Sequence, residues 1–247
     1  MSGFTRRDWL KTTCAAGAAA ILPAVDLFAA QQGFRFQPLQ LNPQAMRHLN
    51  PRVTALDEHE NQALDALLNP NFQGERQALQ AVDRDLEGLL TDPGRPVGFE
   101  PGAFRQEITQ IHDAIVPLLG GVIRQTTVLT IIQRIDIFVG HWYPVNDLYE
   151  VRNCELKIWN MLQSPSPNLR LIELYCRHIR FELQSLFQFH QSGVIGFGTQ
   201  CGQLLGVIQR VEQSCRFGQI RECDQNFMRF TMATDLFCLK YYPQWCG

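Results

Sequence analysis

The sequence lacks the short motifs that identify most catalytic and cofactor-binding proteins. None of its eight cysteines forms a Cys-x-x-Cys pair, which excludes attached c-type haem by pattern and the close spacing of zinc-ribbon or iron–sulfur frameworks. A phosphate loop and the Gly-x-Ser-x-Gly of serine hydrolases are also missing. The glycine run at 193–198 follows a predicted helix without a βαβ frame, so it does not indicate a dinucleotide site.

The histidines show no metal-binding spacing. Glu-x-x-His, which places two ligands of a di-iron bundle on one helix face, does not occur. Glu107 and Glu173 each precede a histidine by five residues, so the two side chains of each pair diverge. We therefore predict no catalytic residue, no metal and no cofactor in this chain, and structural or surface roles for all six histidines: His48, His59, His112, His141, His178 and His190.

Charge is scarce and nearly balanced. Charged residues make up 19% of the chain and apolar residues 45%, which is typical of a folded domain. Beyond the first thirty residues, 19 positive charges face 22 negative ones, and no basic tract occurs. This balance argues against nucleic acid or an anionic membrane surface as the main partner.

The first thirty residues have the layout of a twin-arginine export signal. An alanine-rich, uncharged stretch from Thr12 to Val25 follows two arginines, an aromatic residue, a leucine and a lysine, namely Arg6, Arg7, Trp9, Leu10 and Lys11. The stretch is shorter than the roughly 20 apolar residues of a membrane-spanning helix. We expect a signal at 1–30 and a periplasmic protein, with an uncut anchor as the alternative. The twin-arginine route accepts cargo that is already folded, so the chain either holds a cofactor or travels with a partner that does.

Seven cysteines lie beyond the signal, and in an oxidising compartment such a set predicts disulfides. Four of them fall near the C-terminus: Cys215, Cys223, Cys238 and Cys246. The links expected are 215 with 223 and 238 with 246, or a crossed arrangement, between which the sequence does not decide. The odd count leaves one thiol free or paired with another chain.

Proline, glycine and hydrophobic spacing predict a mostly α protein. Residues 31–53, rich in Gln, Asn and Pro, are expected to form an extended arm. Residues 54–247 are expected to form a single irregular helical domain with a disulfide-stapled C-terminal tail. Apolar residues at helical spacing predict helices over 54–68, 79–90, 104–119, 148–162 and 169–190.

One segment is ambiguous between helix and strand. Val122–Val139 is strongly apolar and β-branched, but it is too long for an ordinary strand, which favours a buried helix. Its polar residues, Gln125, Arg134 and Asp136, argue against a membrane span. We expect a loop at 141–147, where an aromatic group beside a proline is typical of a packing corner or a partner contact.

The C-terminal segment Asn226–Gly247 resembles the end of the small (gamma) subunits of periplasmic flavin-dependent sugar and polyol dehydrogenases. Those subunits also begin with a twin-arginine signal, and they end in a helix with an aspartate, here Asp235, followed by a Tyr-x-Pro-type tail with cysteine and aromatic residues. The helix predicted at Leu56–Leu68 is similar to the start of the related gluconate 2-dehydrogenase subunit 3 family. The resemblance covers the signal, this helix and about twenty C-terminal residues.

The resemblance implies a non-catalytic accessory subunit in an oxidoreductase heterodimer. Such a subunit binds a large flavoprotein of the glucose-methanol-choline (GMC) type in the cytoplasm and escorts it through export, while the FAD belongs to the partner. A cytochrome subunit is a further possible partner, reached through the flavoprotein, and we expect electrons to bypass this chain. An obligate partner face is expected on the arm and the tail, with these contacts in the tail: Tyr241, Tyr242, Pro243 and Trp245.

Two other classes stay open at this stage. A stand-alone exported helical enzyme or ligand-binding protein with an unrecognised site predicts a bound chromophore, metal or substrate in the purified chain. A purely structural envelope protein predicts normal folding and secretion without any partner, but gives no reason for the folded-cargo export route.

Overall fold

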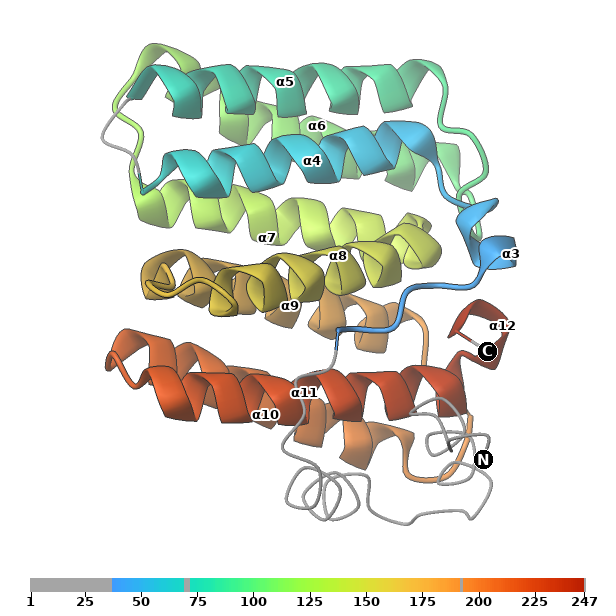
Figure 1. The fold of residues 1–247 in the computed structure, drawn as a ribbon. Helices are drawn as coiled ribbons and strands as arrows, with labels where there is room; N and C mark the ends of the chain where they lie inside the picture. The colour runs from blue at the N-terminus through green and yellow to red at the C-terminus, as the bar shows by residue number, and fades with distance from the viewer. Residues whose placement is uncertain (1–36, 69–71, 192, 247) are drawn as a thin grey trace. The chain divides into compact units, whose positions relative to one another are not determined.

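The computed structural model describes residues 37–68, 72–191 and 193–246, and the regular structure within these ranges is entirely helical (Figure 1). The prediction of a mostly α fold is confirmed. The signal at 1–30, with Arg6, Arg7, Trp9 and Leu10, lies outside the described residues. Within the described ranges, no helix is both long enough and apolar enough to cross a membrane.

Several helices begin at a proline. Proline lacks the N–H that a first-turn residue leaves unbonded, and its fixed φ suits the first helical position. The helices are α3 (Pro43–Met46), α4 (Pro51–Ala66), α5 (Phe72–Thr91), α6 (Pro101–Gly120), α7 (Gln125–Trp142), α8 (Pro144–Leu162), α9 (Leu169–Phe189), α10 (Phe197–Arg216), α11 (Ile220–Tyr241) and α12 (Pro243–Cys246).

The expected arm is partly helical. Asn42 accepts a hydrogen bond from the Ala45 N–H at 2.8 Å and caps α3, and Asn50 caps α4 by accepting from the Arg52 N–H at 3.0 Å. The prolines at 43 and 51 therefore start helices, whereas the sequence pattern predicts an extended arm. Helix α4 begins at Pro51 rather than near Thr54.

Two compact units account for the chain. Among the described residues, unit 1 comprises those up to Arg47, Arg152–Arg180 and those from Gln191 onward, and unit 2 comprises those within His48–Val151 and Phe181–His190. Helices α8 and α9 each contribute residues to both units. Each unit is described separately below.

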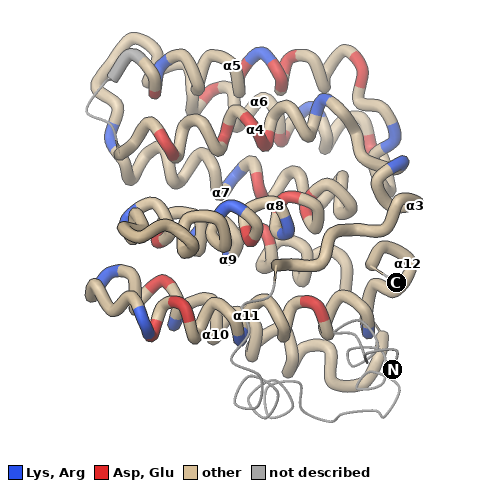
Figure 2. The backbone as a smooth tube through the Cα atoms, viewed as in Figure 1, with Lys and Arg blue, Asp and Glu red and all other residues tan. Residues whose placement is uncertain are grey.

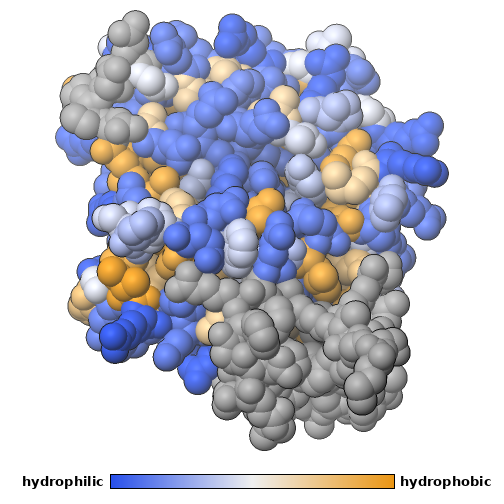
Figure 3. Space-filling view, in the orientation of Figure 1, coloured by the Kyte–Doolittle hydropathy of each residue, from blue (hydrophilic) through white to orange (hydrophobic). Residues whose placement is uncertain are grey.

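In unit 2, helices α4, α5, α6 and α7 pack in sequence, and α7 returns to contact α4 (Figure 1). Their buried residues recur at helical spacing, as in Ile108, Ile111 and Ile115 of α6. Burying each such side chain contributes roughly 1.5–3 kcal/mol. The surface over α4 and α5 is mostly hydrophilic in this view (Figure 3), and charged positions are spread along α5 (Figure 2). One polar face and one apolar face thus fix how each helix lies in the bundle.

In unit 1, α10 packs along α11, α11 contacts α12, and α12 contacts α3. An aromatic cluster fills the end of this unit: Phe197, Phe237, Tyr241, Tyr242 and Trp245. The rings of Tyr242 and Trp245 are stacked, with centroids 5.1 Å apart. The C-terminal tail is therefore anchored by its own aromatic side chains.

The ambiguous segment is helix α7, as its length predicted. The loop expected at 141–147 is wrong, because α7 continues to Trp142, α8 begins at Pro144, and only Tyr143 lies between them. The Tyr143 hydroxyl donates to the carbonyl of Pro93 at 2.6 Å, which holds this sharp corner in place. The packing-corner interpretation of the aromatic group is consistent with this geometry.

Gly140 of α7 sits where a side chain would collide. A Cβ at this position would lie 2.0 Å from Oγ of Ser185, on the α9 part of unit 2. We expect Gly140→Ala to lower the free energy of unfolding by roughly 1–3 kcal/mol, because the helices must separate.

Gly206 of α10 provides the control, since a Cβ there meets nothing within 4 Å. Gly206→Ala is expected to stabilise the protein by a few tenths to roughly 1 kcal/mol through helix propensity. Denaturant unfolding followed by circular dichroism measures both variants. Equal effects of the two substitutions would contradict the close approach at Gly140.

Candidate functional site

Six carboxylates of unit 2, contributed by four helices, are almost completely buried. Each is at most 1% exposed: Asp57 and Glu60 of α4, Asp136 of α7, Asp147 and Glu150 of α8, and Glu182 of α9. The pairs on α4 and α8 share the spacing Asp-x-x-Glu, which places both side chains of a pair on one helix face. Buried carboxylates are costly unless protons, donors or cations compensate their charge. We call these six residues the carboxylate cluster.

Asp147 lies among the acids of the other three helices. Burial raises the pKa of this carboxyl well above its usual range, and the charges of Glu182, Asp136 and Asp57 raise it further. No donor among the described residues reaches either of its carboxylate oxygens. Asp147 also lies within hydrogen-bonding reach of Glu182, with which it can share a hydrogen bond only when one of the two carries a proton.

The other acids of the cluster also lie near one another or are oriented by hydrogen bonds. Glu60 and Asp136 bring carboxylate oxygens within 4.8 Å of each other. The Asn61 amide donates to Oε1 of Glu150 at 2.6 Å and to the backbone carbonyl of Asp57 at 2.8 Å. An amide from α4 thus orients a carboxylate of α8.

The histidines of unit 2 lie elsewhere, most of them beside a single carboxylate near the surface. His59 contacts Asp85 at 2.5 Å, and His112 contacts Asp83 at 2.7 Å. His141 lies 3.1 Å from Glu107, which also accepts from the indole N–H of Trp142 at 3.0 Å. Asp83, Glu87 and His112 also lie close enough together to hold a cation, but this group is partly or fully exposed. His190 donates from Nε2 to the Gly140 carbonyl at 2.7 Å, and burial lowers its pKa.

Unit 1 is built around a buried arginine. The Arg152 guanidinium pairs with Glu155 on its own helix and with Asp235 on α11, and Nε donates to the Leu39 carbonyl at 2.7 Å. The Leu39 N–H donates to the same Asp235 at 3.4 Å. The aspartate noted in the family resemblance therefore anchors both α8 and the arm.

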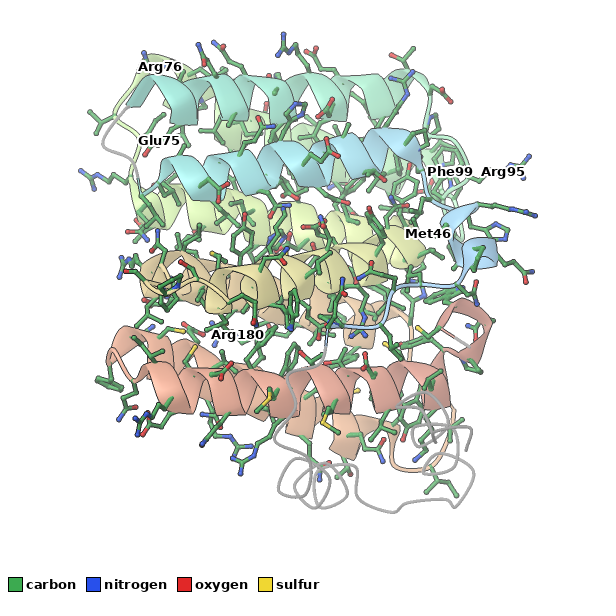
Figure 4. All side chains as sticks on the ribbon, in the orientation of Figure 1. Met46, Glu75, Arg76, Arg95, Phe99 and Arg180 are labelled. Atoms are coloured by element: carbon green, nitrogen blue, oxygen red, sulfur yellow. The ribbon has the colours of Figure 1, made fainter. Side chains whose placement is uncertain are left out.

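The arm and the tail of unit 1 lie against each other. The Asn42 N–H donates to the Trp245 carbonyl at 2.8 Å, and the Asn42 side chain donates to the Gln244 carbonyl at 2.9 Å. Around this junction, Asn42, Pro43, Gln44 and Arg47 line an open hollow. We name the arm–tail surface after its residues on both segments: Asn42, Pro43, Gln44, Met46, Arg47, Pro243, Gln244 and Trp245. Met46 is labelled on α3 in Figure 4.

The four tail residues expected to contact a partner have different positions. Tyr241 and Tyr242 are buried in the aromatic cluster of unit 1, so they have little free surface. Pro243 is exposed, and Trp245 is half-buried. Of these four residues, only Pro243 and Trp245 are accessible to another molecule, because the two tyrosine rings are packed against their aromatic neighbours.

All seven described cysteines are buried, and no disulfide joins any two of them in the described part of the chain. Sγ of Cys215 lies 3.0 Å from Sγ of Cys223, and Cys238 shares a hydrogen bond with Cys246. Burial raises the pKa of the Cys201 thiol to about 12 and that of Cys176 well above its usual range. Their thiolates are therefore disfavoured, and neither is a candidate nucleophile. In unit 1, Sγ of Cys154 lies 3.8 Å from Nδ1 of His178.

The positions of these thiols predict which disulfides form after oxidation. We expect Cys215–Cys223 and Cys238–Cys246, and not the crossed arrangement, because each cysteine has its partner beside it. Peptide mapping by mass spectrometry of protein purified without reductant identifies the links, with a reduced sample as the control. Crossed linkage in the folded protein would contradict the arrangement of α10, α11 and α12.

The Arg152–Asp235 pair should dominate the stability of unit 1. We expect Asp235→Asn to lower the free energy of unfolding by about 1.5–3 kcal/mol, because it removes one of the two carboxylates that pair with the buried guanidinium. Asp92→Asn is the matched control, since Asp92 pairs with Arg52 at 3.5 Å on an exposed surface and such pairs contribute about 0–1 kcal/mol. Thermal and denaturant unfolding measure the difference. Similar small losses in both variants would show that the buried pair is not required.

The carboxylate cluster was not predicted from the sequence, because none of its residues forms a histidine-containing metal motif. The available signal was an acid in an apolar position. Asp57, Glu60 and Leu64 recur at helical spacing and lie on the same buried face of α4. Asp147 and Glu150 recur in the same way on α8.

Comparison of the chain with protein-family models, with curated proteins and with solved structures found no match to any of them.

Proposed function

We propose that this chain is a non-catalytic accessory subunit that binds a flavin-dependent GMC-type dehydrogenase in the cytoplasm. It escorts that partner through twin-arginine export to the periplasm. FAD and catalysis belong to the partner, and this chain contributes the export signal and a binding surface. The proposal has its origin in the signal-like N-terminus and the C-terminal resemblance.

The arm–tail surface is the observation that carries the proposal. The arm and the tail are about 200 residues apart in sequence, and each was expected from the sequence to face a partner. In unit 1 they are joined by two hydrogen bonds from Asn42, so one partner can contact both segments at once.

The chemistry of the arm–tail surface suits a protein partner. Met46 is 41% exposed, Arg47 is exposed, and Trp245 is half-buried against Tyr242. Methionine, arginine and tryptophan are enriched in protein interfaces, where a rigid aromatic ring gives a large contact area at little entropic cost. Pro43 and Pro243 add exposed apolar area on backbones of restricted φ.

Contacts within unit 1 hold both segments of the arm–tail surface in place. Arg152 and Asp235 together hold Leu39 of the arm, and the stacked rings of Tyr242 and Trp245 hold the tail. A preorganised surface loses less conformational entropy on binding. The family-like Asp235 therefore supports the proposed interface from below and does not itself contact the partner.

Purification of the tagged protein from its native periplasm tests the escort role. We expect a stoichiometric flavoprotein without its own signal to copurify, with the visible spectrum of FAD. Changing Arg6 and Arg7 to lysine is expected to retain both proteins in the cytoplasm, because the partner has no other route. A colourless single protein would overturn the proposal, and a single protein with its own absorbance would favour the stand-alone enzyme.

Two substitutions test the interface itself. We expect Trp245→Ala to weaken the complex roughly 30-fold or more, the loss typical of an interface hot spot, and Met46→Asp to weaken it further by placing a charge in the interface. Val122→Asp is the control, because Val122 is 77% exposed and is not one of the residues of the arm–tail surface. Binding measured with purified partner, together with circular dichroism of each variant, separates lost contact from lost folding. Unchanged affinity in both interface variants would remove this surface from the complex.

A further inference from the structure

We propose that the carboxylate cluster of unit 2 is a binding site for a hard divalent cation, with Mn²⁺ as the fitting probe. The ligands are carboxylates of Asp57, Glu60, Asp136, Asp147 and Glu182, contributed by α4, α7, α8 and α9. None of these residues belongs to the arm–tail surface, so the site does not depend on the escort role; only the choice of Mn²⁺ rests on the proposed export route.

The first argument is the arrangement of the acids on the helices. Two helices, α4 and α8, each carry an Asp-x-x-Glu pair, while α7 and α9 each contribute one buried acid. Two-metal carboxylate bundles use the same distribution, with paired ligands on two helices and single ligands on the other two. Here a glutamate stands in each position where those bundles place a histidine.

The second argument is Asp147, which is fully buried and lies near three other acids. Both of its oxygens lack a donor, and its surroundings are Glu182, Asp136 and Asp57, from three different helices. A buried carboxylate that accepts no hydrogen bond is strongly destabilising. A cation among these oxygens compensates that charge, and so does a proton shared with Glu182, so the experiment must distinguish a metal from protons.

The donor set selects the class of metal. Carboxylate oxygens suit Mg²⁺, Ca²⁺ and Mn²⁺, whereas thiolate and imidazole ligands favour zinc and copper. Carboxylate oxygens of Glu60 and Asp136 lie within 4.8 Å of each other, a separation that one cation can bridge after small side-chain rotations. Asn61 fixes Glu150 from the side, which supports the wall of the site.

Burial determines how the metal enters. The six acids are at most 1% exposed, so the ion must be bound while the bundle forms or while it opens. A protein that folds before export would take its metal from the cytoplasm. This order favours Mn²⁺, which binds more weakly than copper or zinc and would lose a competition for the open site.

Refolding of the full chain tests the site. After refolding with Mn²⁺ and desalting, we expect at least one tightly held manganese ion per chain by elemental analysis, with a protein-bound Mn²⁺ signal in electron paramagnetic resonance. The metal-loaded protein should unfold at a higher temperature than protein refolded in chelator. Chelator added after folding should remove the ion slowly, because the site is closed.

Conservative variants locate the ion. Asp147→Asn and Glu182→Gln keep the side-chain volume but remove one charge each, and we expect at least a tenfold loss of retained manganese in both. Asp83→Asn is the matched control, because Asp83 belongs to the exposed group with Glu87 and His112. Circular dichroism confirms that each variant has folded, and should one of the two fail to fold, the other still tests the site.

Three results would overturn the proposal. The first is a wild-type chain that folds equally well in chelator and retains no manganese. The second is metal retention that Asp147→Asn and Glu182→Gln leave unchanged. The third is loss of the metal in Asp83→Asn alone, which would assign the ion to the exposed group. In the first case, shared protons account for the buried acids.

Discussion

The buried guanidinium of Arg152 determines how unit 1 is assembled. It bonds to Asp235 of α11, to Glu155 of α8 and to the Leu39 carbonyl of the arm, so one side chain joins three parts of the chain. A buried guanidinium is tolerated only when its N–H donors are paired with acceptors of opposite or partial negative charge. The position of the arm therefore depends on the contact between α8 and α11, and the tail bonds to the arm through Asn42.

Unit 2 poses the opposite electrostatic problem. Its core holds six acids, and Asp147 faces three of them without a donor on either oxygen. The surrounding helices nevertheless pack tightly, since Gly140 lets Ser185 approach where a side chain would collide. Precise packing around like charges is unusual in a purely structural core, because isolated buried charges cost more free energy than apolar packing of the same volume returns. The two units therefore use buried charge differently, as a closed ion pair in one and as a group of acids in the other.

The helices were predictable because their signals are local. Hydrophobic spacing located α5, α6 and α9, and length alone decided that α7 is a helix. The errors arose where one residue type has two opposite meanings. The sequence placed Pro43 and Pro51 in an extended arm and Pro144 in a loop, yet each begins a helix, because the first helical position needs no N–H.

The candidate sites were harder to predict because they depend on contacts between distant segments. Nothing local shows that Asn42 meets Trp245, or that acids on α4, α7, α8 and α9 converge. The positions of Asp57 and Glu60 on an apolar face did carry a local signal, but a search restricted to histidine-containing motifs could not use it. Tyr241 and Tyr242 were predicted to contact a partner but are buried. An aromatic tail has the same sequence pattern whether its rings pack on the chain's own core or on another protein.

Complete burial of the thiols sets an order of events for oxidation. In a chain that folds in a reducing cytoplasm before export, Cys215 and Cys223 would reach the oxidising compartment already side by side, and so would Cys238 and Cys246. Scrambled isomers and cross-links between molecules are then suppressed kinetically, without the help of an isomerase. The disulfides would then form after folding and stabilise the folded chain, and folding itself would not require them.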